Sequence, residues 1–233
     1  MQEAEVPANT HPILRFARAL AIVGGGDSDP EVLTRLAADG VAVIAADGGA
    51  WSCERAGIIP QAIVGDLDSL GDVDKWAGRS RLVRIDEQVS TDFEKCLYST
   101  EAPLTIALGV TGRRFDHTLA ALSAVARFAA TRRVVVVGEE DIAIGCVGRF
   151  AFAADKGERV SVFPLEDVQF SSSSGLEYPL DGLKLGIGGR TGVSNKALGG
   201  DVTIEPVPGN TGVWLLMLGQ HHLWRMLESQ GAH

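Results

Sequence analysis

The strongest constraint on the fold is a change in sequence pattern near residue 140. Before it, continuous apolar runs alternate with segments of helical periodicity; after it, the chain is glycine-rich, with short apolar or alternating runs between turn residues. Continuous apolar runs that alternate with helices are typical of doubly wound, mostly parallel α/β sheets. Short strands with frequent turns are typical of antiparallel sheets. We therefore predict an α/β domain with a doubly wound sheet over residues 1–142 and an antiparallel β-sandwich domain over residues 143–233.

Apolar runs and capping signals place the expected elements. Strands of the first domain are expected at residues 19–23, 41–46, 62–64, 81–85, 104–108 and 134–137. Helices are expected at 30–38, 91–98 and 116–130. The first begins after Asp29 with Pro30 in its first turn, and the second opens with the capping box of Thr91 and Glu94. Strands of the second domain are expected at 159–163, 168–170, 183–187, 201–205 and 213–218.

Composition excludes several classes of function. The 233 residues include 30 acidic and 21 basic side chains, so the formal net charge is −9. A nucleic-acid or anionic-membrane binder would need a basic face, so neither partner is expected. No apolar run approaches the roughly 18 residues of a membrane span, and the first residues lack a signal-peptide pattern, which predicts a cytoplasmic protein. Three widely spaced cysteines predict neither a disulfide framework nor a cysteine-based zinc site.

Glycine-rich and acidic motifs follow several predicted strands, at the edge where open α/β sheets bind ligands. The sequence after the first strand is Gly-Gly-Gly-Asp at residues 24–27, and Asp47 followed by Gly48 and Gly49 ends the second strand. Glycines allow a phosphate to approach the backbone closely. Each motif taken alone also fits a bland interpretation, a tight turn at 24–27 and a helix cap at Asp47.

Two further acidic motifs suggest a metal. Asp66 and Asp68 are two residues apart, so in extended chain their carboxylates project to the same side and can converge on one Mg²⁺ ion. An ordinary acidic turn is the alternative. Asp92, in the first turn of the helix at 91–98, would either stabilise the helix start or add a third carboxylate, with Lys95 near a phosphate.

The loop at 109–117 combines glycines with Arg113 and Arg114 and leads into a helix, which is a typical anion site. Asp116 at the helix start could bind metal or accept a proton. His117 could act as a general acid or base, although a hydrogen-bonded histidine at a helix end is the favoured interpretation. No Gly-x-x-x-x-Gly-Lys-Ser/Thr loop is present in the sequence, which argues against a P-loop nucleotide site.

The conjunction is more informative than any single motif. Five aspartates fall just after predicted strands or at helix starts, and in a parallel sheet these positions share one edge: Asp47, Asp66, Asp68, Asp92 and Asp116. Five carboxylates in one cleft repel one another unless a cation offsets them. A divalent metal with a polyphosphate, held beside two arginines, accounts for the whole set.

The motifs at 45–50, 65–69, 90–97 and 111–117 together resemble the thiamine pyrophosphokinase (thiamine diphosphokinase) family, and so do segments 159–165, 175–180 and 192–195. The match runs over roughly residues 20–218, with order and spacing kept. The resemblance implies an enzyme that transfers the pyrophosphoryl group of ATP to the hydroxyl of thiamine and releases AMP. It also implies a homodimer whose active sites are shared between subunits.

The resemblance also implies roles for residues. Asp66, Asp68 and Asp92 are the expected Mg²⁺ ligands, and Asp116, Asp68 and Arg113 are the catalytic candidates, with Asp116 orienting or deprotonating the hydroxyl. Ser194 and Asn195 are expected to contact thiamine. The remaining predicted nucleotide and phosphate contacts are Asp47, Gly48, Gly49, Lys95, Thr111, Gly112, Arg113 and Arg114. Val89, Ala121 and Lys196 depart from the family pattern, where acidic or amide residues are usual.

Other interpretations stay open at this point. A related pyrophosphokinase could act on another small alcohol such as a pterin, a nucleotidyltransferase would release pyrophosphate, and a non-catalytic sensor would only bind thiamine or nucleotide. Trp214 is either a platform for the thiamine rings or a core residue. The stretch 219–233 is a final helix or a tail, and its adjacent His221 and His222 are expected to point to different faces rather than form a metal pair.

Overall fold

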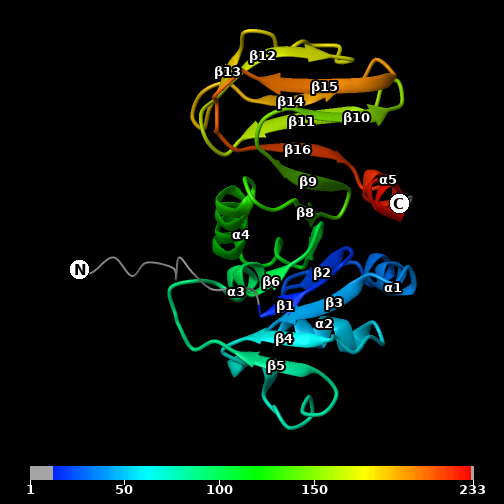
Figure 1. Cartoon of the computed structure of the whole chain (residues 1–233), viewed down its shortest axis with the longest axis vertical. Helices are drawn as coiled ribbons and strands as arrows, with labels where there is room; N and C mark the ends of the chain where they lie inside the picture. Colours follow the sequence, from blue (N-terminus) through cyan, green and yellow to red (C-terminus); the bar gives the residue numbers. More distant parts are fainter. Residues whose placement is uncertain (1–12, 232–233) are drawn as a thin grey trace, which may run out of the picture. The chain divides into compact units, whose positions relative to one another are not determined.

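The computed structural model describes residues 13–231. It divides into two compact units, the first ending at Ala124 and the second beginning at Val125, so the division falls inside helix α4 (Phe115–Phe128) (Figure 1). Within the described range, no helix is both long and apolar enough to cross a membrane. The predicted domain boundary after residue 142 stays a prediction.

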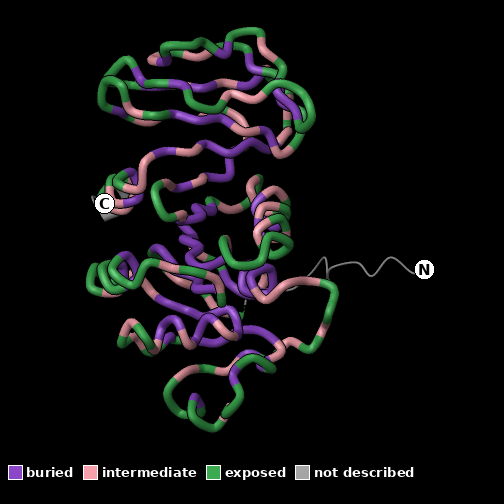
Figure 2. The backbone as a smooth tube through the Cα atoms, turned by 180° about the vertical axis from the view of Figure 1, so that it is seen from behind, coloured by how far each residue is buried: buried purple, intermediate pink, exposed green. Residues whose placement is uncertain are grey.

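The first unit is built on parallel strands. Five strands lie side by side in the order β7, β2, β3, β4, β5, and each pair is parallel where its register is defined. Their bounds are β2 (Leu20–Val23), β3 (Ala42–Ala46), β4 (Ala62–Gly65), β5 (Arg81–Arg84) and β7 (Thr105–Leu108). All residues of β2, β4 and β7 are buried, as expected for strands covered on both faces (Figure 2). The predicted α/β fold class is confirmed.

The helices of this unit begin where capping chemistry predicts. Helix α1 (Pro30–Ala38) is capped by Asp29, whose carboxylate accepts a hydrogen bond from the backbone N–H of Glu31 at 2.8 Å. Helix α3 (Asp92–Ser99) is capped by Thr91, whose Oγ1 accepts from the N–H of Glu94 at 3.3 Å. The other elements are β1 (Leu14–Arg15), α2 (Gly49–Arg55), the 3₁₀ turn η1 (Asp68–Leu70) and β6 (Thr100–Glu101).

The strand order creates a switch point in the sheet. The chain passes from β2 through β3 and β4 to β5 in one direction, and then returns to place β7 on the other side of β2. The strand order therefore reverses between β2 and β7, and the carboxyl ends of the strands at such a switch point are the usual ligand site of these sheets.

The second unit is a pair of antiparallel layers. Strands β8 (Val134–Val137), β9 (Asp141–Cys146), β16 (Trp214–Gly219), β11 (Arg159–Pro164) and β14 (Gly192–Lys196) are successive neighbours. The other layer has the order β10 (Phe150–Ala154), β15 (Gly200–Pro206), β12 (Val168–Ser174), β13 (Lys184–Leu185). The predicted antiparallel β domain is confirmed. The strand predicted at 134–137 is present as β8, which pairs antiparallel with β9.

Trp214 belongs to the core between the two layers. Its ring is fully buried and meets Phe170 of β12 edge to face, with ring centroids 5.6 Å apart. The core alternative for this tryptophan is therefore correct, because a fully buried ring offers no open face to a ligand. The last described element is helix α5 (His222–Gly231), so the described part of the stretch 219–233 ends in a helix.

Candidate active site

A cavity of about 560 Å³ lies in the first unit, at the carboxyl ends of the parallel strands. Its wall is formed by the loops that follow β2, β3, β4, β5 and β7, together with the starts of α3 and α4. Two of the predicted metal ligands, Asp66 and Asp92, line it, and so do most of the predicted nucleotide and phosphate contacts: Asp47, Gly48, Lys95, Thr111, Gly112, Arg113 and Arg114. The fold thus brings together motifs that lie up to 67 residues apart in the sequence.

Two glycine-containing loops meet backbone to backbone at the switch point. The N–H of Gly26 donates to the carbonyl of Gly109 at 2.7 Å. A Cβ atom would lie 2.4 Å from that carbonyl oxygen at Gly24 and 2.6 Å from it at Gly26, so neither position accepts a side chain. The cavity wall here is bare main chain, which a phosphate can approach closely.

Asp47 is a buried carboxylate with an unused oxygen. Its Oδ2 accepts a hydrogen bond from the N–H of Ser69 at 3.1 Å, whereas its Oδ1 has no hydrogen-bond partner among residues 13–231. Burial raises the pKa of this carboxyl, and the hydrogen bonds from Ser69 offset part of that rise. Its backbone is also strained, with φ of +39°. A buried carboxylate oxygen without a donor fits a site that receives a cation.

Three carboxylates form a compact group. Oxygens of Asp47, Asp66 and Asp68 lie within 4.8 Å of one another. Asp66 is oriented by Gln88, whose amide nitrogen donates to Oδ2 at 2.9 Å, and Asp68 accepts from the Ser69 hydroxyl at 3.0 Å. An arrangement of carboxylate oxygens that leaves room for water and phosphate is typical of Mg²⁺ sites.

Asp92 stands beside this group and contacts Lys95. The Lys95 ammonium, which is almost wholly buried, lies 3.1 Å from Asp92 Oδ1. Burial raises the pKa of the Asp92 carboxyl against the opposing effect of Lys95, and the charges of Asp66 and Asp68 raise it further. A Cβ at Gly65 would lie 2.9 Å from both Asp92 Oδ1 and the Asp47 Cβ, so the missing side chain lets these two aspartates approach.

The metal trio predicted from sequence and the trio that the structure groups differ by one member. Asp66 and Asp68 are common to both, while Asp47 takes the place in the compact group that was expected for Asp92. Asp47 was expected to contact nucleotide, and the sequence signal that marks it is the same strand-end Ala-Asp-Gly-Gly motif. Gly49 is packed against the strand instead of the cavity, because its Cβ would lie 1.8 Å from the carbonyl oxygen of Val23.

The arginine loop at 109–114 forms another part of the cavity wall. Arg113 reaches the first glycine loop, where its Nη1 donates to the carbonyl of Gly25 at 3.3 Å and its Nε lies 3.6 Å from the carboxylate of Asp27. Arg113 and its neighbour Arg114 both line the cavity and are largely exposed. They place two guanidinium groups where a polyphosphate would need positive charge.

Asp116 is paired with Arg114 rather than directed into the cavity wall. Arg114 donates to both of its carboxylate oxygens, at 3.1 and 2.6 Å, and this pairing holds the pKa of Asp116 below its usual value. The adjacent His117, named as an acid–base alternative, is the member of this pair that lines the cavity.

The predicted thiamine residues lie in the second unit, on β14. Asn195 is buried, and its side chain is fully used: Nδ2 donates to the carbonyl of Tyr178 at 2.7 Å, and Oδ1 accepts from the N–H groups of Tyr178 and Lys196. Ser194 is exposed and has φ of +61°. Asn195 therefore fixes the local backbone, while Ser194 presents its side chain outward.

Sequence reasoning missed two residues of the cavity wall, Gln88 and Ser69. Gln88 orients Asp66, and Ser69 donates to Asp47 across 22 residues of chain. Ser69 ends the motif at 65–69, but neither its role nor that of Gln88 follows from the local sequence, because their partners come from other strand ends and meet them only in the folded sheet.

Comparison with known proteins identifies the family. The model described as "Thiamin pyrophosphokinase, catalytic domain" matches residues 33–137, and the one described as "Thiamin pyrophosphokinase, vitamin B1 binding domain" matches residues 150–206. No sequence among the curated proteins matches the chain. Together, the two models match well over half of it.

Solved structures of the same family share the fold. Thiamine pyrophosphokinase from Bacillus subtilis is 21% identical with a TM-score of 0.72, over 87% of this chain and 99% of that chain. The enzyme from Candida albicans is 17% identical with a TM-score of 0.75, over 88% and 90%. Yeast thiamin pyrophosphokinase is 17% identical with a TM-score of 0.71, over 91% and 88%. With both of its halves matched in order, the chain belongs to the thiamin pyrophosphokinase family.

Proposed function

We propose that this chain transfers the pyrophosphoryl group of ATP to the hydroxyl of thiamine, giving thiamine diphosphate and AMP, and that the cavity of the first unit holds ATP. The observation that carries the site assignment is the cavity wall itself. It includes Asp47, whose Oδ1 has no hydrogen-bond partner within residues 13–231, the carboxylates of Asp66 and Asp92, bare glycine backbone and two arginines. We keep residues 1–142 as the catalytic domain of this proposal.

The carboxylate group fits Mg²⁺. The buried Oδ1 of Asp47 has no donor within the described chain, and the donor set of Asp47, Asp66 and Asp68 is all oxygen, which suits a hard cation. Asp92, as first predicted, completes the proposed set. When bound, Mg²⁺ supplies positive charge that offsets the charge of the phosphate oxygens in the transition state.

The remaining residues position the polyphosphate and the nucleophile. The thiamine oxygen forms a bond to the β-phosphorus, the bond between that phosphorus and the oxygen shared with the α-phosphate breaks, and AMP leaves with that oxygen while the hydroxyl proton is lost. We assign Arg113, Arg114 and Lys95 to the phosphates, with Thr111, Gly112 and Gly48 at the cavity wall. We assign Asp116 to orienting the hydroxyl, since a carboxylate with a lowered pKa accepts a hydrogen bond but is a weak base.

Thiamine recognition is assigned to the second unit. Ser194 is proposed to contact thiamine, with Asn195 as a positioning residue that holds the backbone beneath it. The further expectations of a homodimer with shared active sites and of a cytoplasmic location are part of the same proposal. Dimerisation would let a Ser194 side chain serve the cavity of the partner.

A product assay tests the function directly. The full chain is incubated with ATP, Mg²⁺ and thiamine, and the nucleotide and phosphate products are separated. AMP and thiamine diphosphate formed in equal amounts, and only when thiamine is present, support the proposal. Pyrophosphate in place of AMP would identify a nucleotidyltransferase. Turnover with a pterin alcohol but not with thiamine would identify another acceptor. Tight thiamine binding without any turnover would identify a sensor.

A further inference from the structure

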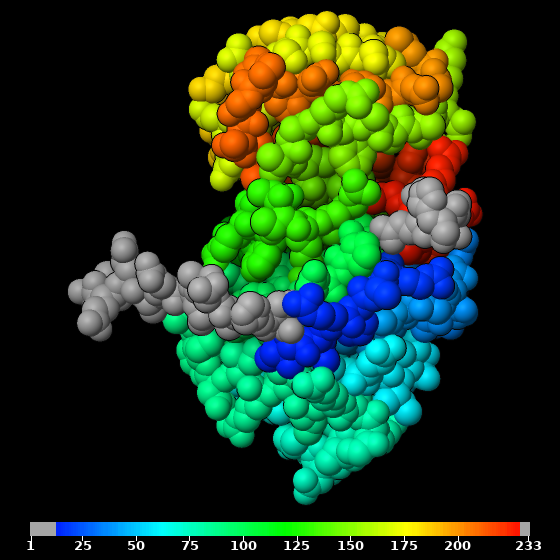
Figure 3. All heavy atoms as spheres, in the orientation of Figure 1, coloured from blue at the N-terminus to red at the C-terminus, as the bar shows by residue number. Residues whose placement is uncertain are grey.

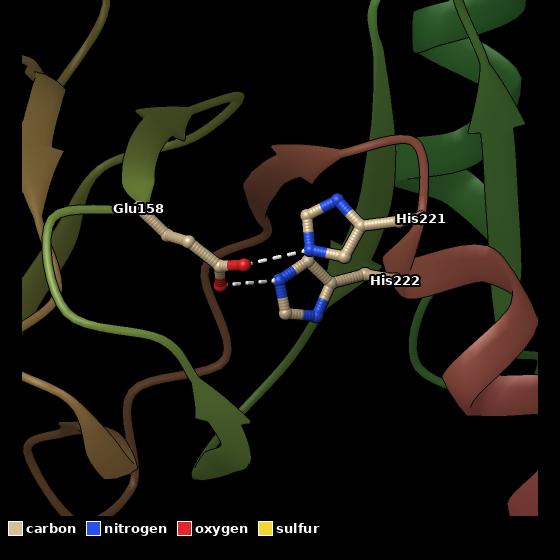
Figure 4. A group of neighbouring side chains, drawn as sticks. All are labelled: Glu158, His221 and His222. Carbon is tan, nitrogen blue, oxygen red and sulfur yellow. Dashed lines mark hydrogen bonds and ion pairs between the residues drawn. The ribbon is translucent and has the colours of Figure 1, made fainter.

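A second group of potential metal ligands lies in the second unit, far in sequence from the aspartates of the cavity. Glu158 directly precedes β11, His221 follows β16, and His222 is the first residue of α5 (Figure 4). One ligand atom from each of the three residues lies within 4.8 Å of the others. The fold thus brings a carboxylate to two adjacent imidazoles that lie 63 and 64 residues further along the sequence.

The prediction that His221 and His222 point to different faces is wrong. Side chains of adjacent residues diverge within a strand or a helix, but His221 lies in the turn between β16 and α5 and His222 begins the helix. The change of backbone direction turns both rings toward the same carboxylate. Their centroids are 4.4 Å apart and their planes are tilted by 39°.

The three ligand groups already have near-ligating geometry. Each histidine uses its Nε2, which lies 2.8 Å from Glu158 Oε1 for His221 and 3.0 Å from Oε2 for His222 (Figure 4). Ligand atoms around a tetrahedral Zn²⁺ ion with bonds of about 2.0–2.1 Å lie about 3.3 Å apart. Both nitrogen–oxygen distances are within about half an ångström of that spacing, and all three ligand atoms lie within 4.8 Å of one another.

The protonation states also suit a metal. Burial lowers the pKa of the His222 imidazole against the opposing effect of Glu158, so this ring is neutral at pH 7. For Glu158, burial raises the pKa, but hydrogen bonds from the Asp155 backbone and from His222 leave it below its usual value, so it is ionised. Neutral imidazole and ionised carboxylate are the forms that bind metal, and a neutral ring ligates through Nε2 in the tautomer that carries its proton on Nδ1.

The surroundings hold the ligands in place and leave an entrance. The N–H of Asp155 donates to Glu158 Oε2 at 3.0 Å, and the ring of Phe152 meets His222 edge to face. Arg225, whose charge acts on His222, is paired with the Asp155 carboxylate at 2.9 Å. The His222 side chain is 5% exposed and that of His221 is 50% exposed, so one ligand is fixed and another reaches solvent. The start of α5 lies at the molecular surface, next to the yellow-green segment that carries Glu158 (Figure 3).

We propose that Glu158, His221 and His222 form a binding site for Zn²⁺ or a similar divalent transition ion, which ties helix α5 to the turn between β10 and β11. Two imidazole nitrogens and one carboxylate favour such ions over Mg²⁺, which prefers oxygen ligands. Three protein ligands leave a fourth position for water. The site is independent of the proposed reaction, because it shares no residue with the cavity of the first unit.

Calorimetric titration of the full chain with Zn²⁺ tests the site, in a buffer with excess Mg²⁺ to occupy the aspartate group. We expect wild type to bind one Zn²⁺ per chain at the histidines. His221→Ala and the isosteric Glu158→Gln should each weaken that binding at least about tenfold, since even indirect supports of a metal site cost 10–100-fold when removed. Glu139→Gln, at an exposed carboxylate of the same unit, is the matched control and should bind as wild type does.

A spectroscopic readout separates ligand loss from misfolding. Co²⁺ added to wild type should give the intense visible absorption of a four-coordinate ion with nitrogen ligands, and His221→Ala should lose it while its circular dichroism stays native. The half-exposed His221 is chosen because a substitution of buried His222 could unfold the unit. Zn²⁺ should also raise the melting temperature of wild type but not that of His221→Ala. No Zn²⁺ uptake by wild type, or equal uptake by wild type and both variants, would overturn the proposal.

Discussion

The carboxylate of Asp47 is held by the backbone N–H of Ser69 through Oδ2, at 3.1 Å, while its Oδ1 has no donor within residues 13–231. The strand end at β3 and the 3₁₀ turn after β4 thus fix one oxygen of a carboxylate that belongs to the compact group with Asp66 and Asp68. A buried, half-satisfied carboxylate destabilises a protein unless a ligand completes it. Stability and function should therefore respond in opposite directions when Asp47 is altered.

Asp47→Asn tests that opposition. The variant should unfold at the same or a higher denaturant concentration than wild type, because a neutral amide avoids the burial cost that raises the pKa of this carboxyl. Its rate of AMP formation should fall at least about 100-fold, since a direct metal contact is lost. Urea unfolding and the AMP assay measure the two effects. A variant that is both less stable and fully active would contradict this assignment.

Asp68→Asn isolates the metal role at an exposed position. Asp68 is exposed on η1, and its carboxylate accepts a hydrogen bond from the neighbouring Ser69 hydroxyl. Its replacement should therefore leave the fold intact. Thiamine-dependent AMP release should be nearly abolished, and the Mg²⁺ concentration needed for half-maximal rate should rise. Asp74→Asn, an exposed aspartate outside the cavity wall, serves as the control and should retain wild-type turnover. Wild-type turnover in Asp68→Asn would exclude this residue from the metal site.

The structure explains why the sequence predicts the cavity better than its internal contacts. Strands buried on both faces are recognisable in the sequence as continuous apolar runs. Because the strands are parallel, the glycine and aspartate motifs that follow them lie at one edge of the sheet. The local sequence does not predict that Asp47, rather than Asp92, joins Asp66 and Asp68 in the compact carboxylate group. Gly65 has no side chain, which lets both aspartates approach, and buried Lys95 contacts Asp92.

Contacts between distant segments were equally beyond sequence reasoning. The rings of His221 and His222 converge because the backbone changes direction between a strand and a helix, whereas periodicity rules describe residues inside one element. Their shared partner, Glu158, comes from a turn in another part of the second unit. Nothing local in either stretch indicates the other.

The two neighbouring glycines Gly25 and Gly26 should behave differently when each is replaced by alanine. A Cβ at Gly26 would lie 2.6 Å from the carbonyl of Gly109 and 2.7 Å from that of Thr111, whereas a Cβ at Gly25 has its nearest neighbour at 3.9 Å. Gly26→Ala should therefore force two backbone segments apart and lower the free energy of unfolding by about 1–3 kcal/mol. Gly25→Ala should leave it unchanged or slightly raise it. Urea unfolding of the pair measures the difference, and equal stabilities would show that the loops are not packed this tightly.

Glu87 should make stability depend on pH through the loop that carries Gln88. Partial burial raises the pKa of its carboxyl, but hydrogen bonds from Ser90 and Tyr98 outweigh this effect and leave the pKa below its usual value. A carboxyl with a lowered native pKa stabilises the fold above its unfolded pKa of about 4.3 and loses that contribution as pH falls through the native value. Glu87→Gln should therefore lower the free energy of unfolding by about 1–2 kcal/mol at pH 7 and by less at pH 3.5.

Tyr98→Phe, which removes one hydrogen-bond donor and keeps the ring, should lower the free energy of unfolding by a smaller amount at pH 7. Urea unfolding at both pH values checks this, and a cost for Glu87→Gln that is the same at both would mean that the ionised carboxylate does not hold the loop.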